Sequence, residues 1–219
     1  AEVEYTGCPV VFRTHFVIEG DPKVSILIPN KDHTEDLNKC VTSILERSTW
    51  KNIQIIVIEN NSEKEETFHY YEELEKRYPQ AKVVTWDGPF NYSAINNFGA
   101  KYADGDYLLL LNNDTEVITP EWLENMMGYC QREDVGIVGA KLLYPDNTVQ
   151  HAGVVVGIAG FAGHILTGYD RYATGTVFNS LRISYCIFMY AACNQIINPV
   201  QSAQSRYGHR MFRGNNNRF

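Results

Sequence analysis

Short apolar runs alternate along the chain with segments in which apolar residues recur every three or four positions. The runs at residues 24–29, 53–58 and 107–111 have no helical gaps, which predicts strands buried on both faces of a parallel sheet. Residues 81–86 and 135–140 predict two further strands. The periodic segments predict helices at residues 35–47, 64–78, 91–103 and 120–132. Strand and helix therefore alternate with short connections, which predicts an α/β fold built from right-handed βαβ units.

Polar residues follow the last of these buried runs. Behind the four leucines at residues 108–111 come Asn112, Asn113 and Asp114. Ligands of open α/β sheets bind outside the carboxyl ends of the strands, and oxygens from one carboxylate and two amides suit Mg²⁺ or Mn²⁺ carrying a diphosphate. An alternative interpretation is a turn that caps the helix opened by Pro120, because Asn and Asp are favoured in caps.

Two other predicted strands also end in polar residues. Residues 29–31 and 59–62 follow the first and second strands, and parallel strands bring their carboxyl ends to one edge of the sheet. The chain contains neither a GxGxxG dinucleotide fingerprint nor a Walker phosphate loop. The sequence thus predicts a nucleotide-diphosphate site with a metal ion, built without a glycine-rich loop.

Composition narrows the range of partners. The net charge of −7 gives no indication of nucleic acid or of an anionic membrane. Five cysteines without a CxxC pair favour reduced thiols in a cytoplasmic setting. The longest apolar run, residues 183–193, is too short to span a bilayer, which leaves peripheral contact with a membrane open.

The chain divides into three predicted parts. Residues 1–22 form an N-terminal extension, residues 23–182 the domain that carries the nucleotide-diphosphate site, and residues 183–219 a divergent tail that looks disordered. Residues 171–219 contain six arginines but no lysine and no acidic residue.

Several sequence motifs resemble those of a known protein family. Residues 24–30 (VSILIPN), 58–62 (IENNS) and 111–114 (LNND) resemble the three N-terminal motifs of the inverting family 2 glycosyltransferases. Four longer segments are similar to the rhamnosyltransferase-type subgroup of bacterial cell-surface polysaccharide synthesis: 88–97 (GPFNYSAINN), 111–120 (LNNDTEVITP), 139–146 (GAKLLYPD) and 149–153 (VQHAG). The resemblance runs from about residue 22 to about residue 181. It implies the GT-A fold, which is a Rossmann-like, mainly parallel sheet flanked by helices.

The resemblance also implies roles for individual residues. Asp114 would be the metal-binding carboxylate for Mn²⁺ or Mg²⁺, with Asn113 beside it, and Pro29 and Asn30 would line the base and ribose pocket. The segment 59–62 would contact the base. The complete set of expected donor-binding residues is Pro29, Asn30, Glu59, Asn60, Asn61, Asn91, Ser93, Asn97, Asn112 and Asn113.

The sequence departs from the family pattern in two places. Many members have Asp-Asp where this chain has Glu59-Asn60, and many have a basic residue where it has Asn96. The first change affects the contact with the base. The second removes a positive charge near the diphosphate, which leaves the metal ion as its main neutralising partner.

These implications define an inverting, metal-dependent glycosyltransferase of the hexosyltransferase type. The donor would be a UDP- or dTDP-linked sugar, the acceptor a saccharide or a lipid-linked saccharide, and the location the cytoplasm or the inner face of the cell membrane. The family takes its catalytic carboxylate from a more C-terminal acidic motif, but no acid follows Asp170. We therefore assign no catalytic base in this chain, and we expect a truncated or altered version of a longer enzyme with little or no turnover. Apolar surface exposed by such a loss would favour a homodimer.

Two other functions remain open at this stage. One is a nucleotide-sugar-binding module without catalysis, which the missing base favours. The other is a sugar nucleotidyltransferase, which ranks lower because the loop at residues 29–34 contains no glycine. His151 and His164 could touch donor or acceptor and Trp86 could stack on a base, although such residues are more often structural. Ser93 is interpreted as a helix N-cap, which needs no ligand.

Overall fold

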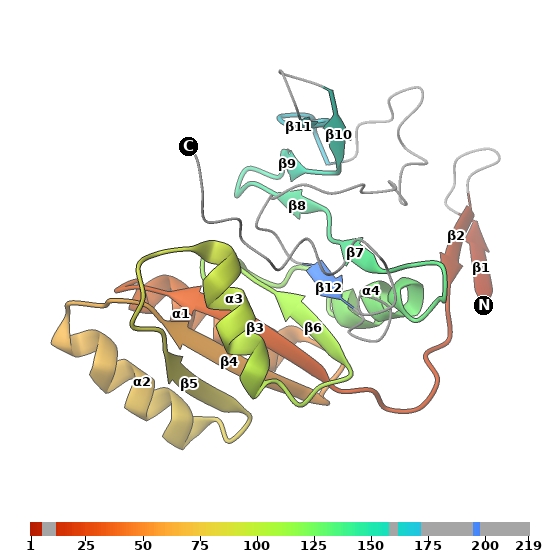
Figure 1. The fold of residues 1–219 in the computed structure, drawn as a ribbon. Helices are drawn as coiled ribbons and strands as arrows, with labels where there is room; N and C mark the ends of the chain where they lie inside the picture. Colours follow the sequence, from red (N-terminus) through yellow and green to blue (C-terminus); the bar gives the residue numbers. More distant parts are fainter. Residues whose placement is uncertain (6–11, 158–161, 172–194, 198–219) are drawn as a thin grey trace.

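The computed structural model describes residues 1–5, 12–157, 162–171 and 195–197. Its centre is a six-stranded sheet with the strand order β5-β4-β3-β6-β12-β7 (Figure 1). The four parallel strands are β3 (Val24–Asn30), β4 (Ile53–Glu59), β5 (Ala81–Thr85) and β6 (Tyr107–Leu110). This confirms the predicted α/β fold with a mainly parallel sheet.

Helices cover both faces of this sheet and bury its apolar side chains. On one face the core joins β3 and β4 to α1 (Thr34–Arg47), α2 (Glu65–Arg77) and α4 (Trp122–Cys130). On the other face, Ile95 of α3 (Tyr92–Gly99) packs with Leu27 and Ile58. A 3₁₀ helix, η1 (Ala100–Tyr102), continues α3. Because β3 and β4 are buried on both sides, they carry continuous apolar runs rather than an alternating pattern.

The sheet includes residues from the predicted tail. Strand β12 (Gln195–Ile197) lies antiparallel between β6 and β7 (Ile137–Gly139). These three residues belong to the segment predicted as a divergent tail, where periodicity over so short a stretch gives no strand signal. The remainder of the predicted tail lies outside the described residues.

In the described part of the chain, three small antiparallel pairs lie outside this sheet. They are β1 (Glu2–Tyr5) with β2 (Phe12–His15), β8 (Leu142–Leu143) with β9 (Val149–His151), and β10 (Val154–Val156) with β11 (Ala162–His164). The N-terminal extension contacts α4, where the Tyr129 hydroxyl donates to Thr14 O at 3.0 Å and the Tyr129 ring packs edge-on against Phe16. The extension is thus anchored to the domain at this helix.

The helix N-caps exclude one alternative interpretation and correct one prediction. The N-cap position of α4 is Glu121, seven residues beyond Asp114, so Asn112, Asn113 and Asp114 do not cap that helix. The N-cap of α3 is Asn91, whose side chain accepts from Ala94 N at 3.0 Å, and Ser93 lies inside the first turn. Asn at the N-cap satisfies a helix donor as well as Ser does, which is why the sequence did not separate the two positions.

Within the described residues, the structure has no helix that is both long enough and apolar enough to cross a membrane.

Candidate functional site

The candidate site lies at the carboxyl edge of the parallel strands. Asn30 and Glu59 are direct neighbours at the ends of β3 and β4, and Asn60 N donates to Asn30 O at 3.0 Å. On the other side of β3, Leu111 N donates to Leu27 O at 2.9 Å, which fixes the start of the loop after β6. The backbone ladder therefore brings the three predicted polar segments together, as expected for the ends of adjacent parallel strands.

A relay of side-chain hydrogen bonds joins these strand ends. Asn113 Nδ2 donates to Asn30 Oδ1 at 2.6 Å, and Asn30 Nδ2 donates to the Tyr71 hydroxyl at 2.8 Å. The Tyr71 hydroxyl in turn donates to Glu59 Oε2 at 2.7 Å. We call these four side chains the strand-end relay. It connects the loop after β6 with β3, β4 and α2 through groups that are mostly shielded from solvent.

Glu59 is the buried end of the strand-end relay. The residue is 2% exposed, and its carboxylate accepts from Tyr71 and from both Ser62 N and the Ser62 hydroxyl. Burial raises the pKa of the Tyr71 hydroxyl, so that this group keeps its proton and stays a donor. A buried carboxylate needs such partners to offset its desolvation. Both oxygens of Glu59 are thus used inside the protein.

Asp114 lies next to the strand-end relay. Its side chain is exposed, and among the described residues it makes no hydrogen bond and no ion pair. Two hydrogen bonds to Asn112 O hold the loop around Asp114. The Thr115 hydroxyl donates to this oxygen at 3.0 Å, and Cys40 Sγ on α1 donates to it at 3.7 Å. The arrangement presents an unengaged carboxylate from a fixed loop.

The polar residues after β4 divide into buried and exposed members. Asn60 is 4% exposed and donates through Nδ2 to Trp86 O and Gly88 O at 3.2 and 3.1 Å. Asn61 is exposed, has a positive φ of 58°, and donates to Gly88 O at 3.0 Å. Asn60 therefore holds the following loop in place, whereas Asn61 lies at the surface of the candidate site.

The Trp86 side chain packs against other residues of the protein. Its ring lies 5.4 Å from that of Phe98, and its Nε1 donates to Pro89 O at 3.2 Å. A Cβ on Gly88 would come within 2.6 Å of the indole, so this turn accepts only glycine without rearrangement. These contacts favour the structural interpretation of Trp86.

The predicted donor residues of α3 are arranged along a short uncharged helix. Asn91 is exposed at its N-cap, while Ser93 and Asn97 are partly buried in the helix itself. The intervening Asn96 is 3% exposed; its Nδ2 donates to Tyr92 O at 2.8 Å, and its Oδ1 is buried without a partner among the described residues. Helix α3 packs on the face of the sheet opposite to Tyr71, so it approaches the strand ends from the other side.

Tyr71 is the member of the strand-end relay that the sequence did not reveal. It lies on α2, whose sequence is rich in acidic residues, and it is 5% exposed. Its spacing of three residues from the buried Leu74 indicates the inner face of the helix. That pattern could have predicted burial, but not the partners of the hydroxyl.

A second feature of the same loops is the carboxylate of Asp32. It accepts from Glu63 N and Lys64 N at 3.0 Å each and from the Thr67 hydroxyl at 3.1 Å. Desolvation raises the pKa of Asp32, but these hydrogen bonds outweigh it and hold the pKa below the usual value. Asp32 thus ties the loop after β3 to the segment that leads into α2, the helix that carries Tyr71.

The two histidines singled out in the sequence contact each other. Their Nδ1 atoms lie 2.8 Å apart, so one ring donates and the other accepts, and the rings meet edge to face. His151 is buried, and burial lowers its pKa, with a further contribution from His164. The pair joins β9 to β11, which is a structural role.

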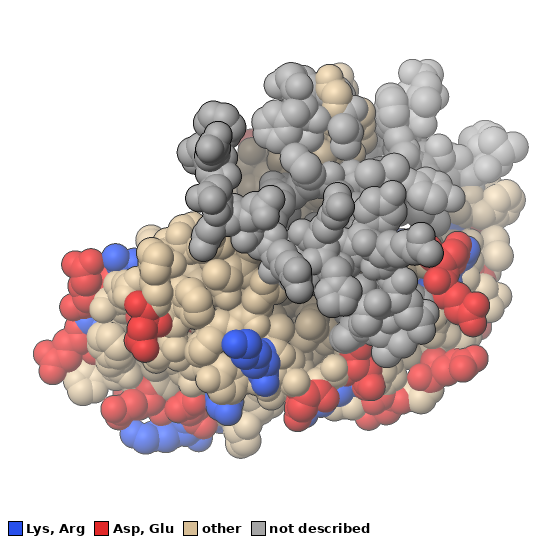
Figure 2. Space-filling model, in the orientation of Figure 1, with Lys and Arg blue, Asp and Glu red and all other residues tan. Residues whose placement is uncertain are grey.

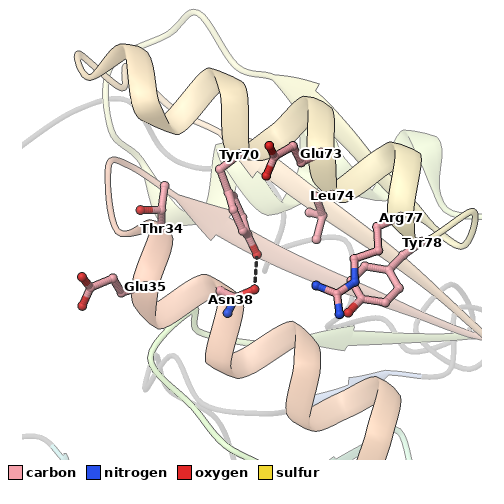
Figure 3. Close-up of a pocket in the computed structure, with 8 residues that line it drawn as sticks. All are labelled: Thr34, Glu35, Asn38, Tyr70, Glu73, Leu74, Arg77 and Tyr78. Carbon is pink, nitrogen blue, oxygen red and sulfur yellow. Dashed lines mark hydrogen bonds between the residues drawn. The ribbon is translucent and has the colours of Figure 1, made fainter.

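A groove of about 320 Å³ lies between α1 and α2. Figure 3 shows Tyr70 reaching from α2 toward Asn38 on α1, with the hydroxyl 3.5 Å from Asn38 Oδ1 and Arg77 beside Tyr78. Its lining includes none of the residues of the strand-end relay. Tyr70 and Tyr71 thus point to different surroundings although they are adjacent in sequence.

Charge is unevenly distributed over the face that carries α3. Figure 2 shows acidic and basic side chains gathered toward α2 and along the lower rim, with a largely uncharged surface between them and the region that is not described. Helix α3 contains no acidic or basic residue. A diphosphate near this helix would therefore find no cation on it.

The donor atoms at the strand ends fit a small divalent cation. Asp114 offers a carboxylate, and the Asn113 side chain offers an oxygen, because its Nδ2 is engaged with Asn30. Within the described residues no group of three or more His, Cys, Asp or Glu side chains is gathered that could hold a metal alone. Mg²⁺ and Mn²⁺ favour oxygen ligands, and Mg²⁺ commonly binds through one or two carboxylates plus substrate phosphates, so the set fits an ion that arrives with a diphosphate.

Comparisons with known proteins place the chain in a family. Residues 25–184 match Glycosyl transferase family 2, and the chain belongs to that family. Over 156 residues, or 71% of the chain, it is 47% identical to the O-antigen biosynthesis protein RfbC of Myxococcus xanthus. Over the same length it is 44% identical to the uncharacterized protein y4gI of Sinorhizobium fredii (strain NBRC 101917 / NGR234). The aligned part spans 12% and 17% of these two relatives.

A solved structure shares the fold. The mannosyltransferase PcManGT from Pyrobaculum calidifontis, in complex with GDP-Man and Mn²⁺, superimposes with a TM-score of 0.52 at 14% sequence identity. The match covers 59% of this chain and 38% of that one. The expected GT-A fold is thus confirmed.

Proposed function

We propose that the strand-end site binds a nucleotide-diphosphate sugar together with Mn²⁺ or Mg²⁺ and serves an inverting glycosyl transfer in polysaccharide synthesis. The observation that carries this proposal is the unengaged carboxylate of Asp114, held beside Asn113 at the end of β6. Membership of Glycosyl transferase family 2 and the similarity to an O-antigen biosynthesis protein support the transfer and its setting. The mannosyltransferase PcManGT, whose structure was solved with GDP-Man and Mn²⁺, supports the ligand class.

The residues at the strand ends have separate roles in this proposal. Asp114 would hold the metal ion, with the oxygen of Asn113 and the backbone around Asn112 at its side. When bound, the ion would supply Lewis-acid stabilisation of the negative charge that grows on the departing diphosphate. Pro29 would line the pocket for base and ribose, and Asn30, which is 3% exposed with both amide atoms engaged, would shape that pocket from within the protein. Asn61, which is exposed after β4, would contact the base.

The buried residues act indirectly in this proposal. The polar atoms of Glu59 and Asn60 are engaged within the protein, so these two residues shape the base pocket instead of touching the base with free groups. Asn91, Ser93 and Asn97 remain proposed donor contacts on α3. UDP and dTDP sugars are the proposed donors, and a saccharide or lipid-linked saccharide at the inner membrane face is the proposed acceptor.

A second candidate function is a nucleotide-sugar-binding module without turnover. The observation that favours it is the complete absence of acidic residues from 171–219, the part of the chain in which the resemblance places the catalytic carboxylate. Both candidates require the same donor site. They differ in whether a carboxylate deprotonates the acceptor hydroxyl as the glycosidic bond forms.

A thermal-shift screen tests the shared donor site. UDP, dTDP, GDP and ADP would each be added at saturating concentration, with Mn²⁺ or with a chelator, and the unfolding midpoint recorded. A ligand at one hundred times its dissociation constant stabilises the folded state by about 2.7 kcal/mol, which gives a measurable rise. We expect a rise with UDP or dTDP that requires Mn²⁺. No rise with any of the four nucleotides would overturn the proposal.

A further inference from the structure

The direction of every hydrogen bond in the strand-end relay follows from its buried end. Glu59 Oε2 accepts from the Tyr71 hydroxyl, and the single hydrogen of that hydroxyl is thereby used. The oxygen of that hydroxyl then accepts from Asn30 Nδ2, which turns Asn30 Oδ1 toward Asn113. Side-chain amides are otherwise ambiguous by a 180° flip, and here the relay removes the ambiguity.

The same hydrogen-bond directions determine which side-chain atom of Asn113 is not used by the relay. Because Asn30 presents an oxygen, Asn113 must present its Nδ2, and the 2.6 Å bond between them leaves Asn113 Oδ1 as the atom not used by the relay. The loop next to Asp114 is thereby given an acceptor, which suits a cation, instead of an N–H group, which would repel one.

We propose that Tyr71 is a positioning residue of the donor site: through Asn30, its hydroxyl sets the orientation of Asn113 and so the metal-dependent part of nucleotide binding. This inference rests on the proposed function. Tyr71 is 5% exposed, so it acts through Asn30 and Asn113 without touching the nucleotide. Without the hydroxyl, Asn30 loses the partner that holds its amide, and either flip of Asn30 and Asn113 becomes available.

The neighbouring tyrosine provides a matched control. Tyr70 lies on the same helix and is half-buried, but its hydroxyl is 3.5 Å from Asn38 Oδ1 in the groove between α1 and α2 (Figure 3). Burial raises the pKa of both hydroxyls, so both are protonated donors near neutral pH. Tyr70→Phe and Tyr71→Phe remove the same atom from adjacent positions, and only the second lies in the relay.

Calorimetric titration of UDP and dTDP tests the inference, with Mn²⁺ and with a chelator. For each nucleotide, the measured quantity is the dissociation constant in chelator divided by the dissociation constant in Mn²⁺. A general loss of stability leaves this ratio unchanged in folded protein. Changes behind a metal ligand typically cost ten- to a hundredfold in metal affinity, so we expect Tyr71→Phe to reduce the ratio about tenfold. Tyr70→Phe should keep the wild-type ratio. Equal ratios for the two variants would overturn the inference while the proposed function stands.

A double-mutant cycle gives a second readout. If Tyr71 acts through Asn113, the variant with both Tyr71→Phe and Asn113→Ala should bind no more weakly than Asn113→Ala alone, since the orientation of a missing side chain has no effect. Independent, multiplying losses would contradict the relay. Wild-type protein that binds neither nucleotide in Mn²⁺ would overturn the proposed function itself, and the inference with it.

The relay can also be tested in the wild-type protein, should Tyr71→Phe not fold. Nuclear magnetic resonance would follow the exchange of side-chain amide protons with solvent. We expect the Asn30 and Asn113 amides to exchange at least about tenfold more slowly than that of the exposed Asn38, because theirs are hydrogen-bonded donors. Exchange of Asn113 as fast as that of Asn38 would overturn the inference.

Discussion

Asn113 Nδ2 donates to Asn30 Oδ1 across 2.6 Å, and this bond ties the loop after β6 to the end of β3. Asn30 is in turn adjacent to Glu59 in the parallel ladder. A residue expected near the metal is thus held by a residue expected near the base. The candidate donor site is therefore one hydrogen-bonded network, and a change at the buried Glu59 or Tyr71 should alter the orientation of Asn113.

The buried carboxylate of Glu59 should stabilise the fold through its three donors. Glu59→Gln keeps the shape but offers an N–H₂ group to Ser62 and Tyr71, which leaves donors facing donors. Loss of hydrogen bonds to a buried charged group costs about 1–3 kcal/mol, and we expect that decrease in the free energy of unfolding. Urea denaturation measures it. Glu63→Gln, at an exposed ion pair with Lys31, is the control and should change little.

The turn before β6 should tolerate only glycine at position 105. A Cβ on Gly105 would come within 2.7 Å of both Lys23 O and Ser25 N, which are backbone atoms of the adjacent chain segment. Gly105→Ala must push these segments apart, and such overpacking costs about 1–3 kcal/mol. Gly136→Ala is the matched control, because nothing lies within 4 Å of its added Cβ. Equal unfolding midpoints for the two variants would show that the turn is looser than described.

Cys40 should resist alkylation in the folded protein. Burial raises the pKa of its thiol to about 11, and the residue is fully enclosed under the loop at Asn112. The thiolate is the reactive form, and it is lost below the pKa, so at pH 8 only about one thiol in a thousand would be ionised. Iodoacetamide labelling followed by peptide mass spectrometry checks this. Cys40 should react in urea but not in buffer, and rapid labelling of native protein would contradict the burial.

The main strands and helices could be predicted from the sequence because they depend on local patterns of apolar and polar residues. The runs that became β3 and β4 are apolar at nearly every position, as expected of strands buried on both faces, and α1 begins and ends within one residue of its prediction. The resemblance to family 2 was confirmed, as was the GT-A fold. The individual donor and metal residues remain predictions.

The missed features depend on contacts between distant parts of the chain. Tyr71 stands among acidic residues in the sequence of α2, and its partners Asn30 and Glu59 lie 41 and 12 residues away. Glu59 was expected to face the base, whereas its carboxylate is enclosed by Ser62 and Tyr71. Strand β12 enters the sheet antiparallel between two strands, a pairing that no local periodicity specifies.

The central claim is that Asp114 provides a metal-dependent site for a nucleotide diphosphate. Its most direct test is calorimetric titration of UDP and dTDP into the wild-type protein, Asp114→Ala and Glu116→Ala, with and without Mn²⁺. Glu116 is an exposed acid of the same loop, 3.4 Å from Arg47, and serves as the control for loss of negative charge. We predict Mn²⁺-dependent binding that Asp114→Ala weakens at least about tenfold and that Glu116→Ala preserves. Binding that is independent of Mn²⁺, or equal in wild type and Asp114→Ala, would contradict the claim.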